Sequence, residues 1–233
     1  MSYLADSHFG NDTGLRPIVS HQFGRSSISE TTPVVFVVDD DISVRESLEP
    51  LIGRQGWCPE TFASAEELLT HPPEHVPSCL IFDVSGSGSR GLELQNQFAV
   101  ERPEVSIIFL SATDNVPTTV KAMKAGAVEF FKKPFPNDAL LSAIREGLER
   151  SRSVLANEAE KRVLRNCYAS LSNRERQVMT LVTSGLLNKQ VGHELGISEI
   201  TVKAHRGQVM QKMHADSFAH LVKMAAKLGV AAA

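Results

Sequence analysis

The sequence has few cysteines and no long apolar run. Its three cysteines, Cys58, Cys79 and Cys167, are widely separated, and they form neither a Cys-x-x-Cys pair nor a metal-binding spacing. We therefore expect free, buried thiols in a reducing cytoplasm. No apolar stretch approaches the ~18 residues that a membrane span needs, and the N-terminus lacks the apolar core of a signal peptide. These absences favour a cytoplasmic protein without a membrane partner.

Neither sign of charge dominates the chain, but the two signs are unevenly distributed. The net charge of the 233 residues is −3. Residues 33–150 hold 18 acidic and 10 basic residues, a balance of −8, whereas residues 168–233 hold 8 basic and 4 acidic residues, a balance of +4. This asymmetry indicates an acidic module joined to one that faces nucleic acid, with chance scatter of solvated charges as the alternative.

Strand patterns alternate with helix patterns from residue 34 onward. The expected strands are residues 34–38, 57–62, 79–83, 106–111 and 127–131. The expected helices are 42–55, a short one opened by a capping box at 64–67, one from about 92, one at 116–125 and one from about 137. Five βα units predict an α/β fold, a doubly wound five-stranded parallel sheet with helices on both faces. In the flavodoxin-like order 2-1-3-4-5, ligands bind beyond the carboxyl ends of the first and third strands.

The remainder of the chain shows only helix patterns. The helix from 137 is expected to continue to 166 as a long linker, and Ser172 and Glu175 form a capping box for the next helix. Asn188 is expected to cap a short helix that ends at Gly196, and Ser198 to cap another that runs to about residue 213. Two short helices joined by a tight turn predict an all-α helix-turn-helix domain.

Polar side chains follow the carboxyl ends of four expected strands. Asp39 and Asp40 follow the first strand, Asp83 ends the third, Ser111 ends the fourth and Lys133 follows the fifth. Clustered carboxylates need a divalent cation to offset their repulsion, and oxygen ligands favour Mg²⁺, or Mn²⁺ in its place. An aspartate can act as a nucleophile and form an aspartyl phosphate, whose charge the metal and the lysine would neutralise. The pattern predicts a metal-dependent phosphoryl-transfer pocket.

Each of these residues also has a structural explanation when it is taken alone. Asp83 fits a turn, Ser111 a strand-end hydroxyl and Lys133 a solvated charge, so the convergence of the group carries the prediction. Asp41 is expected to cap the first helix and to bind no metal. Residues 86–91 spell G-x-G-x-x-G, but the acidic residue expected about 20 positions later is missing, and Asp83 would repel a pyrophosphate. No dinucleotide site is expected.

The last helix of the helix-turn-helix has two distinct faces. Stepping ~100° per residue from Val202 places Val209 and Met213 on its inner face, whereas the outer face is small and lightly charged and suits the major groove. His205 is expected to be a packed core histidine. Arg206 is expected to reach a phosphate or to pair with Glu175. The candidate DNA contacts are Lys189, Ile200, Lys203, Ala204, Arg206, Gly207 and Gln211.

These motifs resemble a two-domain bacterial response regulator of the FixJ/NarL group, in which a CheY-like receiver precedes a LuxR-type helix-turn-helix. The resemblance covers about 33–230 and rests on residues 38–41, 83, 111, 123–127, 133–135, 174–176, 185–189 and 201–205. It implies four parts: a disordered arm at 1–32, a receiver core at 33–136, a linker helix at 137–166 and a DNA-binding domain at 167–233.

The resemblance also implies roles for single residues. Asp83 would be the phosphoacceptor, and Asp39, Asp40 and the backbone carbonyl of Ser85 would complete the metal site. Ser111 and Phe130 would be the switch pair, and Lys133 would contact the phosphate, followed by a cis peptide at Pro134. The chain departs from the family at Gly86 and Ser87, where a hydrophobic residue and proline are usual, and at Asp216, where a basic residue is frequent.

The resemblance implies a cytoplasmic transcriptional regulator rather than a metabolic enzyme. A sensor histidine kinase would phosphorylate Asp83, and the protein would then bind promoter DNA as a homodimer, with RNA polymerase as a further partner. One alternative is a degenerate receiver on a phosphorylation-independent regulator, to which the Gly/Ser loop at 85–89 lends the sole support. The other is an aspartate-nucleophile phosphatase, a class whose second aspartate is replaced here by Ser85.

Overall fold

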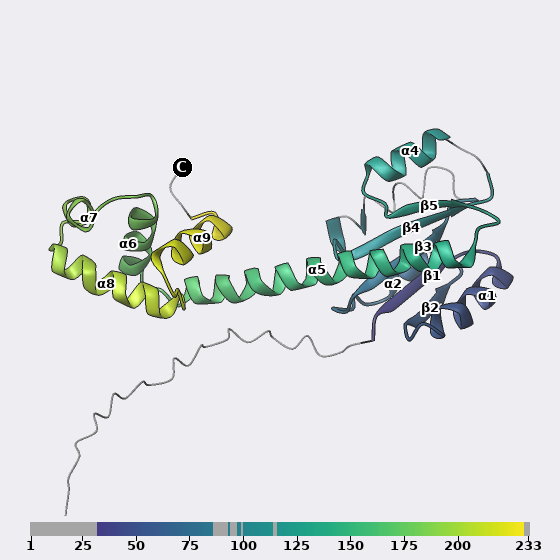
Figure 1. Cartoon of the computed structure of the whole chain (residues 1–233), viewed down its shortest axis with the longest axis horizontal. Helices are drawn as coiled ribbons and strands as arrows, with labels where there is room; N and C mark the ends of the chain where they lie inside the picture. Colours follow the sequence, from purple (N-terminus) through teal and green to yellow (C-terminus); the bar gives the residue numbers. More distant parts are fainter. Residues whose placement is uncertain (1–31, 86–92, 94–96, 99, 114–115, 231–233) are drawn as a thin grey trace, which may run out of the picture. The chain divides into compact units, whose positions relative to one another are not determined.

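A computed structural model describes residues 32–85, 93, 97–98, 100–113 and 116–230. The strands are β1 (Val34–Val38), β2 (Cys58–Phe62), β3 (Ser78–Asp83), β4 (Val105–Ser111) and β5 (Glu129–Lys132). They pair in parallel in the order β2-β1-β3-β4-β5, which confirms the predicted doubly wound sheet (Figure 1). The predicted arm and the loop at 86–91 lie outside the described residues.

Helices flank this sheet and make up the C-terminal part of the chain. Their bounds are α1 (Ile42–Gly53), α2 (Ala65–Thr70), α4 (Val116–Lys124), α5 (Asn137–Ala169), α6 (Asn173–Thr183), α7 (Asn188–Leu195), α8 (Glu199–Lys212) and α9 (Phe218–Leu228). The helix expected from residue 92 lies largely outside the described residues. In the part of the chain that the structure describes, no helix is long and apolar enough to cross a membrane.

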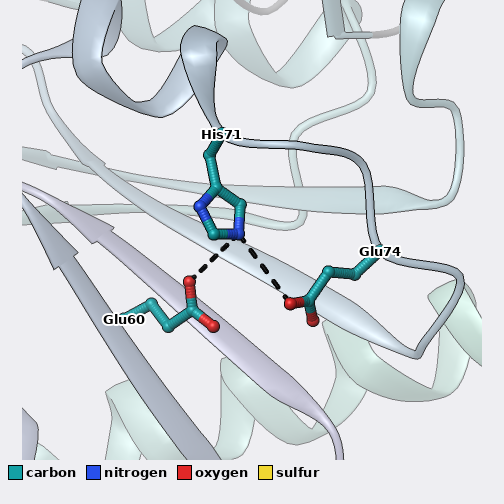
Figure 2. A group of neighbouring side chains, drawn as sticks. All are labelled: Glu60, His71 and Glu74. Atoms are coloured by element: carbon teal, nitrogen blue, oxygen red, sulfur yellow. Dashed lines mark ion pairs between the residues drawn. The ribbon is translucent and has the colours of Figure 1, made fainter.

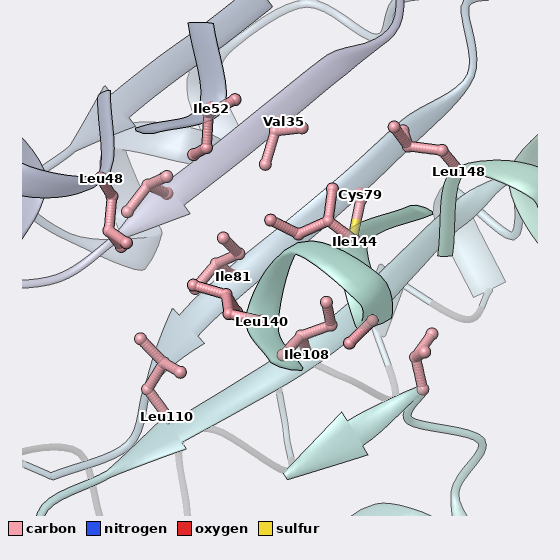
Figure 3. Close-up of a cluster of buried hydrophobic side chains, with 13 residues drawn as sticks. Val35, Leu48, Ile52, Cys79, Ile81, Ile108, Leu110, Leu140, Ile144 and Leu148 are labelled. Carbon is pink, nitrogen blue, oxygen red and sulfur yellow. The ribbon is translucent and has the colours of Figure 1, made fainter. Parts of the chain in front are cut away.

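The alternating side chains of the strands supply two separate apolar layers. On one face of the sheet, β1 residues Val35 and Val37 pack with Leu48 of α1 and Ile144 of α5 (Figure 3). On the other face, Phe36 and its neighbours pack against α2 and α4. Because both faces are covered, the central strands read as nearly continuous apolar runs, and this is why they were recognisable in the sequence.

Side-chain caps fix where several helices begin. Asp41 accepts a hydrogen bond from the Ser43 amide, which confirms that it caps α1. Ser64 caps α2, and Ser172 and Glu175 form the predicted capping box of α6. Ser198 caps α8 as predicted.

The prediction that Asn188 caps α7 is wrong. The cap residue is Leu187, and its backbone amide is satisfied by the side chain of Gln190 at 2.8 Å. Asn188 is instead the first helical residue, and its side chain accepts a hydrogen bond from Arg206 at 3.2 Å. A glutamine three residues after the cap position therefore replaces the asparagine cap that the sequence suggested.

Helix α5 belongs to two hydrophobic cores. Its first turns bury Leu140, Ile144 and Leu148 against the sheet, and Ser151 accepts a hydrogen bond from the backbone amide of Ser78, the first residue of β3, at 2.8 Å. Its last turns contribute Leu164 to the core of α6 to α9. Residues 156–163 between these two contacts are exposed. The helix extends to Ala169, past the predicted end at 166.

A tight turn joins α7 to α8 and completes a helix-turn-helix. Gly196 ends α7 with φ of +65°, a left-handed conformation that favours glycine. Gly192 allows a close approach, since a Cβ there would lie 2.8 Å from the Ile197 carbonyl oxygen. The core beneath this turn contains the fully buried Val191, Val202 and Val209.

The cysteines are free, but they are not all buried. Cys79 in β3 is fully buried, and burial raises the pKa of its thiol to about 12. Cys167 is half-buried, and Cys58 is exposed, so the expectation that all three are buried is wrong for Cys58. Cys58 begins β2, the edge strand, where a side chain is not enclosed on both sides.

Gly147 marks the closest approach of α5 to the sheet. A Cβ at this position would lie 2.9 Å from the Cys79 sulfur and 3.2 Å from the Ser106 Cβ. Gly147→Ala should therefore lower the free energy of unfolding by about 1–2 kcal/mol, because overpacking outweighs the gain in helix propensity. Gly53→Ala is the control, since no atom lies within 4 Å of its added Cβ, and it should be neutral or stabilising.

Urea unfolding followed by the fluorescence of Trp57 measures both variants. Trp57 is the single tryptophan of the chain and packs against the sheet core, so it reports on this domain alone. Equal stability of Gly147→Ala and Gly53→Ala would contradict the tight contact.

Candidate functional site

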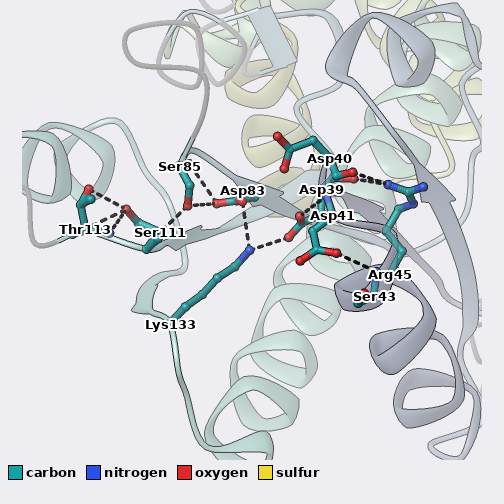
Figure 4. A network of polar contacts seen from close by, with 11 residues as sticks. Asp39, Asp40, Asp41, Ser43, Arg45, Asp83, Ser85, Ser111, Thr113 and Lys133 are labelled. Atoms are coloured by element: carbon teal, nitrogen blue, oxygen red, sulfur yellow. Dashed lines mark hydrogen bonds and ion pairs between the residues drawn. The ribbon is translucent and has the colours of Figure 1, made fainter.

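The carboxyl ends of the strands bring the predicted polar residues to one rim (Figure 4). Asp39 directly follows β1, Asp83 ends β3, Ser111 ends β4 and Lys133 directly follows β5. The rim includes the junction of β1 and β3, where the direction of the chain connections reverses.

Lys133 bridges two of the carboxylates. Its ammonium group donates to Asp39 Oδ2 at 2.7 Å and to Asp83 Oδ2 at 3.0 Å. The Asp39 side chain is completely buried and that of Asp83 is 6 % exposed. The lysine thus holds together the ends of three strands, β1, β3 and β5.

Burial and pairing set the charge states at this rim. Burial raises the pKa of Asp39 above its usual range, although hydrogen bonds from Lys133 and from the Asp41 amide oppose the shift. Burial by itself would lower the pKa of Lys133, but its hydrogen bonds to Asp39 and Asp83 outweigh this, and the net pKa is raised. Lys133 therefore remains a cation at neutral pH.

Asp40 adds a third carboxylate to the pair. One carboxylate oxygen from each of Asp39, Asp40 and Asp83 lies within 4.8 Å of the others. Three carboxylates facing one ammonium group leave an excess of negative charge, which a divalent cation with oxygen ligands would offset. The donor set fits Mg²⁺, and the exposure of Asp40 leaves the site open to the waters that this ion retains.

Arg45 is a rim residue that the sequence reasoning missed. From the first turns of α1, its guanidinium donates to the backbone carbonyl oxygens of Asp39 at 2.5 Å and of Asp40 at 3.3 Å. These bonds fix the backbone that carries both carboxylates. A basic residue shortly after an acidic cluster was the available signal.

Ser85 contacts Asp83 through its side chain. Its hydroxyl donates to Asp83 Oδ1 at 2.6 Å, its backbone amide donates to the same oxygen at 2.9 Å, and the hydroxyl accepts from the Ala112 amide at 2.8 Å. The two oxygens of Asp83 are therefore engaged on different sides, Oδ1 by Ser85 and Oδ2 by Lys133. The sequence pointed only to the carbonyl group of Ser85.

Ser111 lies on the rim but turns toward Thr113. Its hydroxyl donates to the Thr113 carbonyl at 3.0 Å and accepts from the Thr113 amide at 3.2 Å. Phe130 is half-buried, with its ring centroid 6.2 Å from that of Phe109 in the sheet core. The peptide bond between Lys133 and Pro134 is cis, as the resemblance implied.

The helix-turn-helix presents the predicted faces. Val202, Val209 and Met213 are buried inside, whereas Ile200 is 80 % exposed. Lys203 is exposed and pairs with Glu199 at 3.2 Å, one turn earlier in α8. The other predicted contacts on the exposed surface are Lys189, Ala204, Gly207 and Gln211.

Arg206 does not pair with Glu175. Its guanidinium lies 4.5 Å from the centroid of the Phe218 ring and hydrogen-bonds Asn188, which ties α8 to α7 and α9. Glu175 instead accepts two bonds from Lys212, at 2.7 and 2.9 Å. The helical step placed Arg206 near the inner face correctly, but it could not show which neighbouring helix meets it.

Two further residues of the C-terminal part were singled out in the sequence. His205 is half-buried rather than enclosed in the core. Asp216 is exposed, and its carboxylate lies 3.5 Å from the imidazole of His220 in the first turn of α9.

Known proteins match both parts of the chain. Residues 35–145 match the response regulator receiver domain, and residues 169–225 match the luxR family of bacterial regulatory proteins. Nodulation protein W of Bradyrhizobium diazoefficiens is 44 % identical over 211 residues, which cover 90 % of this chain and 92 % of that protein. Transcriptional regulatory protein FixJ of Azorhizobium caulinodans is 38 % identical, covering 88 % and 96 %. The solved structure of the response regulator StyR aligns with a TM-score of 0.73 at 43 % identity, covering 84 % of this chain and all of that one.

The bridge formed by Lys133 predicts a measurable stability loss. Lys133→Met would leave Asp39 buried beside Asp83 without a cation, and we expect a loss of about 2 kcal/mol, between the values for exposed and for fully buried pairs. Because the pKa of Lys133 is raised above its ordinary 10.5, this contribution is fully present below pH 10.5 and is lost as pH rises through the folded-state value.

Urea unfolding followed by Trp57 fluorescence at several pH values tests this expectation. Lys124→Met, a change of the same kind on the exposed side of α4, is the matched control and should cost little. A loss in Lys133→Met no larger than that of the control at pH 7 would show that the bridge is not stabilising.

Proposed function

Because the chain belongs to the response regulators that join a receiver domain to a luxR-family regulatory domain, we propose that Asp83 accepts a phosphoryl group from a sensor histidine kinase. The observation that carries this assignment is the placement of Asp83 at the carboxyl end of β3, between Lys133 and Ser85 and beside two further carboxylates. Of these three carboxylates, Asp83 alone bonds both Lys133 and Ser85, the donors that would face a phosphoryl group.

In the proposed reaction, a carboxylate oxygen of Asp83 attacks the phosphorus of the donor. The new oxygen–phosphorus bond forms as the bond from phosphorus to the histidine nitrogen breaks, and the imidazole leaves with its electron pair and takes up a proton. The product is a mixed anhydride at Asp83, which water can hydrolyse. In this proposal the receiver carries out its own phosphorylation and dephosphorylation and acts on no metabolite.

The carboxylates of Asp39, Asp40 and Asp83 and the carbonyl of Ser85 would hold Mg²⁺ or Mn²⁺, which supplies positive charge to the phosphoryl oxygens. Lys133 would keep its bond to Asp39 and exchange its bond to Asp83 for one to a phosphoryl oxygen. The Ala112 amide, now satisfied by the Ser85 hydroxyl, would become a second donor. Ser111 would rotate from Thr113 toward the phosphoryl group.

The switch would reach the rest of the chain through Phe130. If Ser111 moves toward the phosphoryl group, Phe130 can fill the space behind it, since burial alone favours this ring. The proposed result is a changed surface around α4, where Val120 and Met123 are exposed, and formation of a homodimer. Phosphorylation drives this change only to the extent that the phosphoryl group stabilises one conformation more than the other.

The C-terminal domain would deliver the response at promoter DNA. The exposed face of α8 would enter the major groove, with Lys203 reading a base edge and Ile200 contacting a thymine methyl group. Lys189, at the N-terminus of α7, would contact a phosphate. With DNA as its partner, the protein would act in the cytoplasm, where RNA polymerase is a further candidate partner. The proposed parts of the chain remain the N-terminal arm at 1–32, the receiver core at 33–136, the linker helix at 137–166 and the DNA-binding domain at 167–233.

The phosphoacceptor can be tested with a small phosphodonor and Mg²⁺. The intact wild-type protein should gain the mass of one phosphoryl group, which hydroxylamine removes, and Asp83→Asn should gain none. Asp41→Asn is the control because asparagine caps a helix as well as aspartate does, so labelling should continue. Labelling of Asp83→Asn at the wild-type level would refute the assignment.

The same samples distinguish the alternative of a phosphorylation-independent regulator. Sedimentation and DNA affinity should both change when the wild-type protein is phosphorylated. Successful labelling that leaves both the sedimentation and the DNA affinity unchanged would support the alternative instead.

The DNA interface predicts two kinds of loss. Lys203→Ala should weaken binding to the specific site by about 1–3 kcal/mol and bind random duplexes nearly as well as the wild type. Lys189→Ala should weaken binding to all duplexes alike, and it should reduce the slope of log affinity against log salt concentration by about one. Lys223→Ala, on the exposed side of α9, is the control of equal charge and should change little. Equal losses for Lys203→Ala on specific and random duplexes would exclude base reading.

A further inference from the structure

A second group of side chains with potential metal-ligand atoms lies beside the edge strand β2 (Figure 2). Glu60 is on the edge strand β2, His71 directly follows α2, and Glu74 lies in the segment that leads to β3. His71 Nε2 is 3.3 Å from Glu60 Oε2 and 3.8 Å from Glu74 Oε1, and one donor atom of each residue lies within 4.8 Å of the others.

The orientation of the His71 ring is set by its packing. The ring meets Phe36 and Phe62 edge-on, with centroids 5.9 and 5.6 Å apart. The guanidinium of Arg102 donates to the His71 carbonyl oxygen at 2.5 Å and so holds the backbone. Aromatic contacts and a backbone bond therefore direct Nε2 toward the carboxylates, independently of any attraction between them.

His71 Nε2 is nevertheless left without a hydrogen bond. Among the described residues, this atom is the one buried side-chain nitrogen or oxygen without a hydrogen-bond partner, although Glu60 Oε2 lies 3.3 Å away. Buried polar atoms are almost always paired, and an unpaired one calls for an ion or water that satisfies it. The nitrogen is close to two carboxylates but is not aligned to donate to either, and a cation between the three groups would satisfy all of them.

The donor set and its spacing fit a transition-metal dication. Ligand atoms around Zn²⁺ lie about 2.0–2.2 Å from the metal, which puts neighbouring ligands ~3.4 Å apart in a tetrahedral site. The separation of 3.3 Å between His71 and Glu60 matches this spacing, and the separation of 3.8 Å between His71 and Glu74 is slightly larger; the half-exposed side chain of Glu74 has room to close. An imidazole nitrogen favours zinc-like metals, whereas the all-carboxylate rim favours Mg²⁺.

We propose that Glu60, His71 and Glu74 form a binding site for a zinc-like dication, with water in the fourth position. The metal would tie the segment before β3 to the edge strand β2. This site is distinct from the carboxylate cluster of Asp39, Asp40 and Asp83, and the proposal does not depend on phosphorylation of Asp83.

Metal titration of the full-length protein tests the proposal. After treatment with a chelator, the wild-type protein should bind Zn²⁺ in competition with a chromophoric chelator, and Co²⁺ should produce visible absorption that Zn²⁺ removes. Glu60→Gln and Glu74→Gln should each weaken the affinity about tenfold or more, the size of loss seen even when residues that only support a ligand are changed. Zn²⁺ should raise the thermal unfolding midpoint of the wild type more than that of either variant.

Two controls separate this site from others in the chain, which contains 8 histidines. His75→Ala removes an exposed histidine near the cluster, and His193→Ala removes an exposed histidine in α7; neither should change Zn²⁺ affinity. The glutamine variants keep the packing of His71 against the phenylalanines, so a folding defect does not obscure the result. Zn²⁺ affinity that is unchanged in both glutamine variants, or that falls as far in His75→Ala, would overturn the proposal and leave an ordinary ion pair.

Discussion

The arrangement of the rim depends on a single cation between two buried carboxylates. Placing Asp39 at the end of a buried strand costs desolvation energy, and Asp83 adds like-charge repulsion. Lys133 offsets both because it reaches the two carboxylates from β5, at the far edge of the sheet order. Three segments of the chain that are distant in sequence are thereby held together at the site where we propose phosphoryl transfer.

The two oxygens of Asp83 have different protein partners, and this affects how a phosphoryl group would enter. Oδ2 bonds the ammonium group of Lys133, while Oδ1 bonds the hydroxyl and the amide of Ser85. A phosphoryl group at Asp83 would therefore exchange existing bonds rather than fill an open site. Its effect on the fold would be the difference between the bonds it offers and those it displaces, which is the quantity that shifts a two-state equilibrium.

The sequence predicted the layers of the fold but not all of its contacts. Buried parallel strands are almost wholly apolar, so β1, β3 and β4 were apparent, and their order follows from a small set of topologies. Caps at Asp41, Ser172 and Ser198 are local, and short-range spacing was enough to find them. The pairing of Lys212 with Glu175 spans 37 positions, and its choice over Arg206 depends on how three helices pack.

The same distinction explains what was missed around the two candidate sites. Strand ends predicted the gathering of Asp39, Asp83 and Lys133, because all parallel strands present their carboxyl ends at one edge. Ser85 was assigned a backbone role, and the direction of its hydroxyl follows from a turn that no pattern specifies.

The His71 cluster has no sequence signature, since its ligands come from a strand, a helix end and a loop at irregular spacing. Its geometry rests on the two phenylalanines that fix the ring, and hydrophobic packing thus decides where a polar atom points. In the rim, charge pairing fixes the side chains; in the cluster, apolar contacts fix the histidine and leave its nitrogen to be satisfied by whatever binds between the two glutamates.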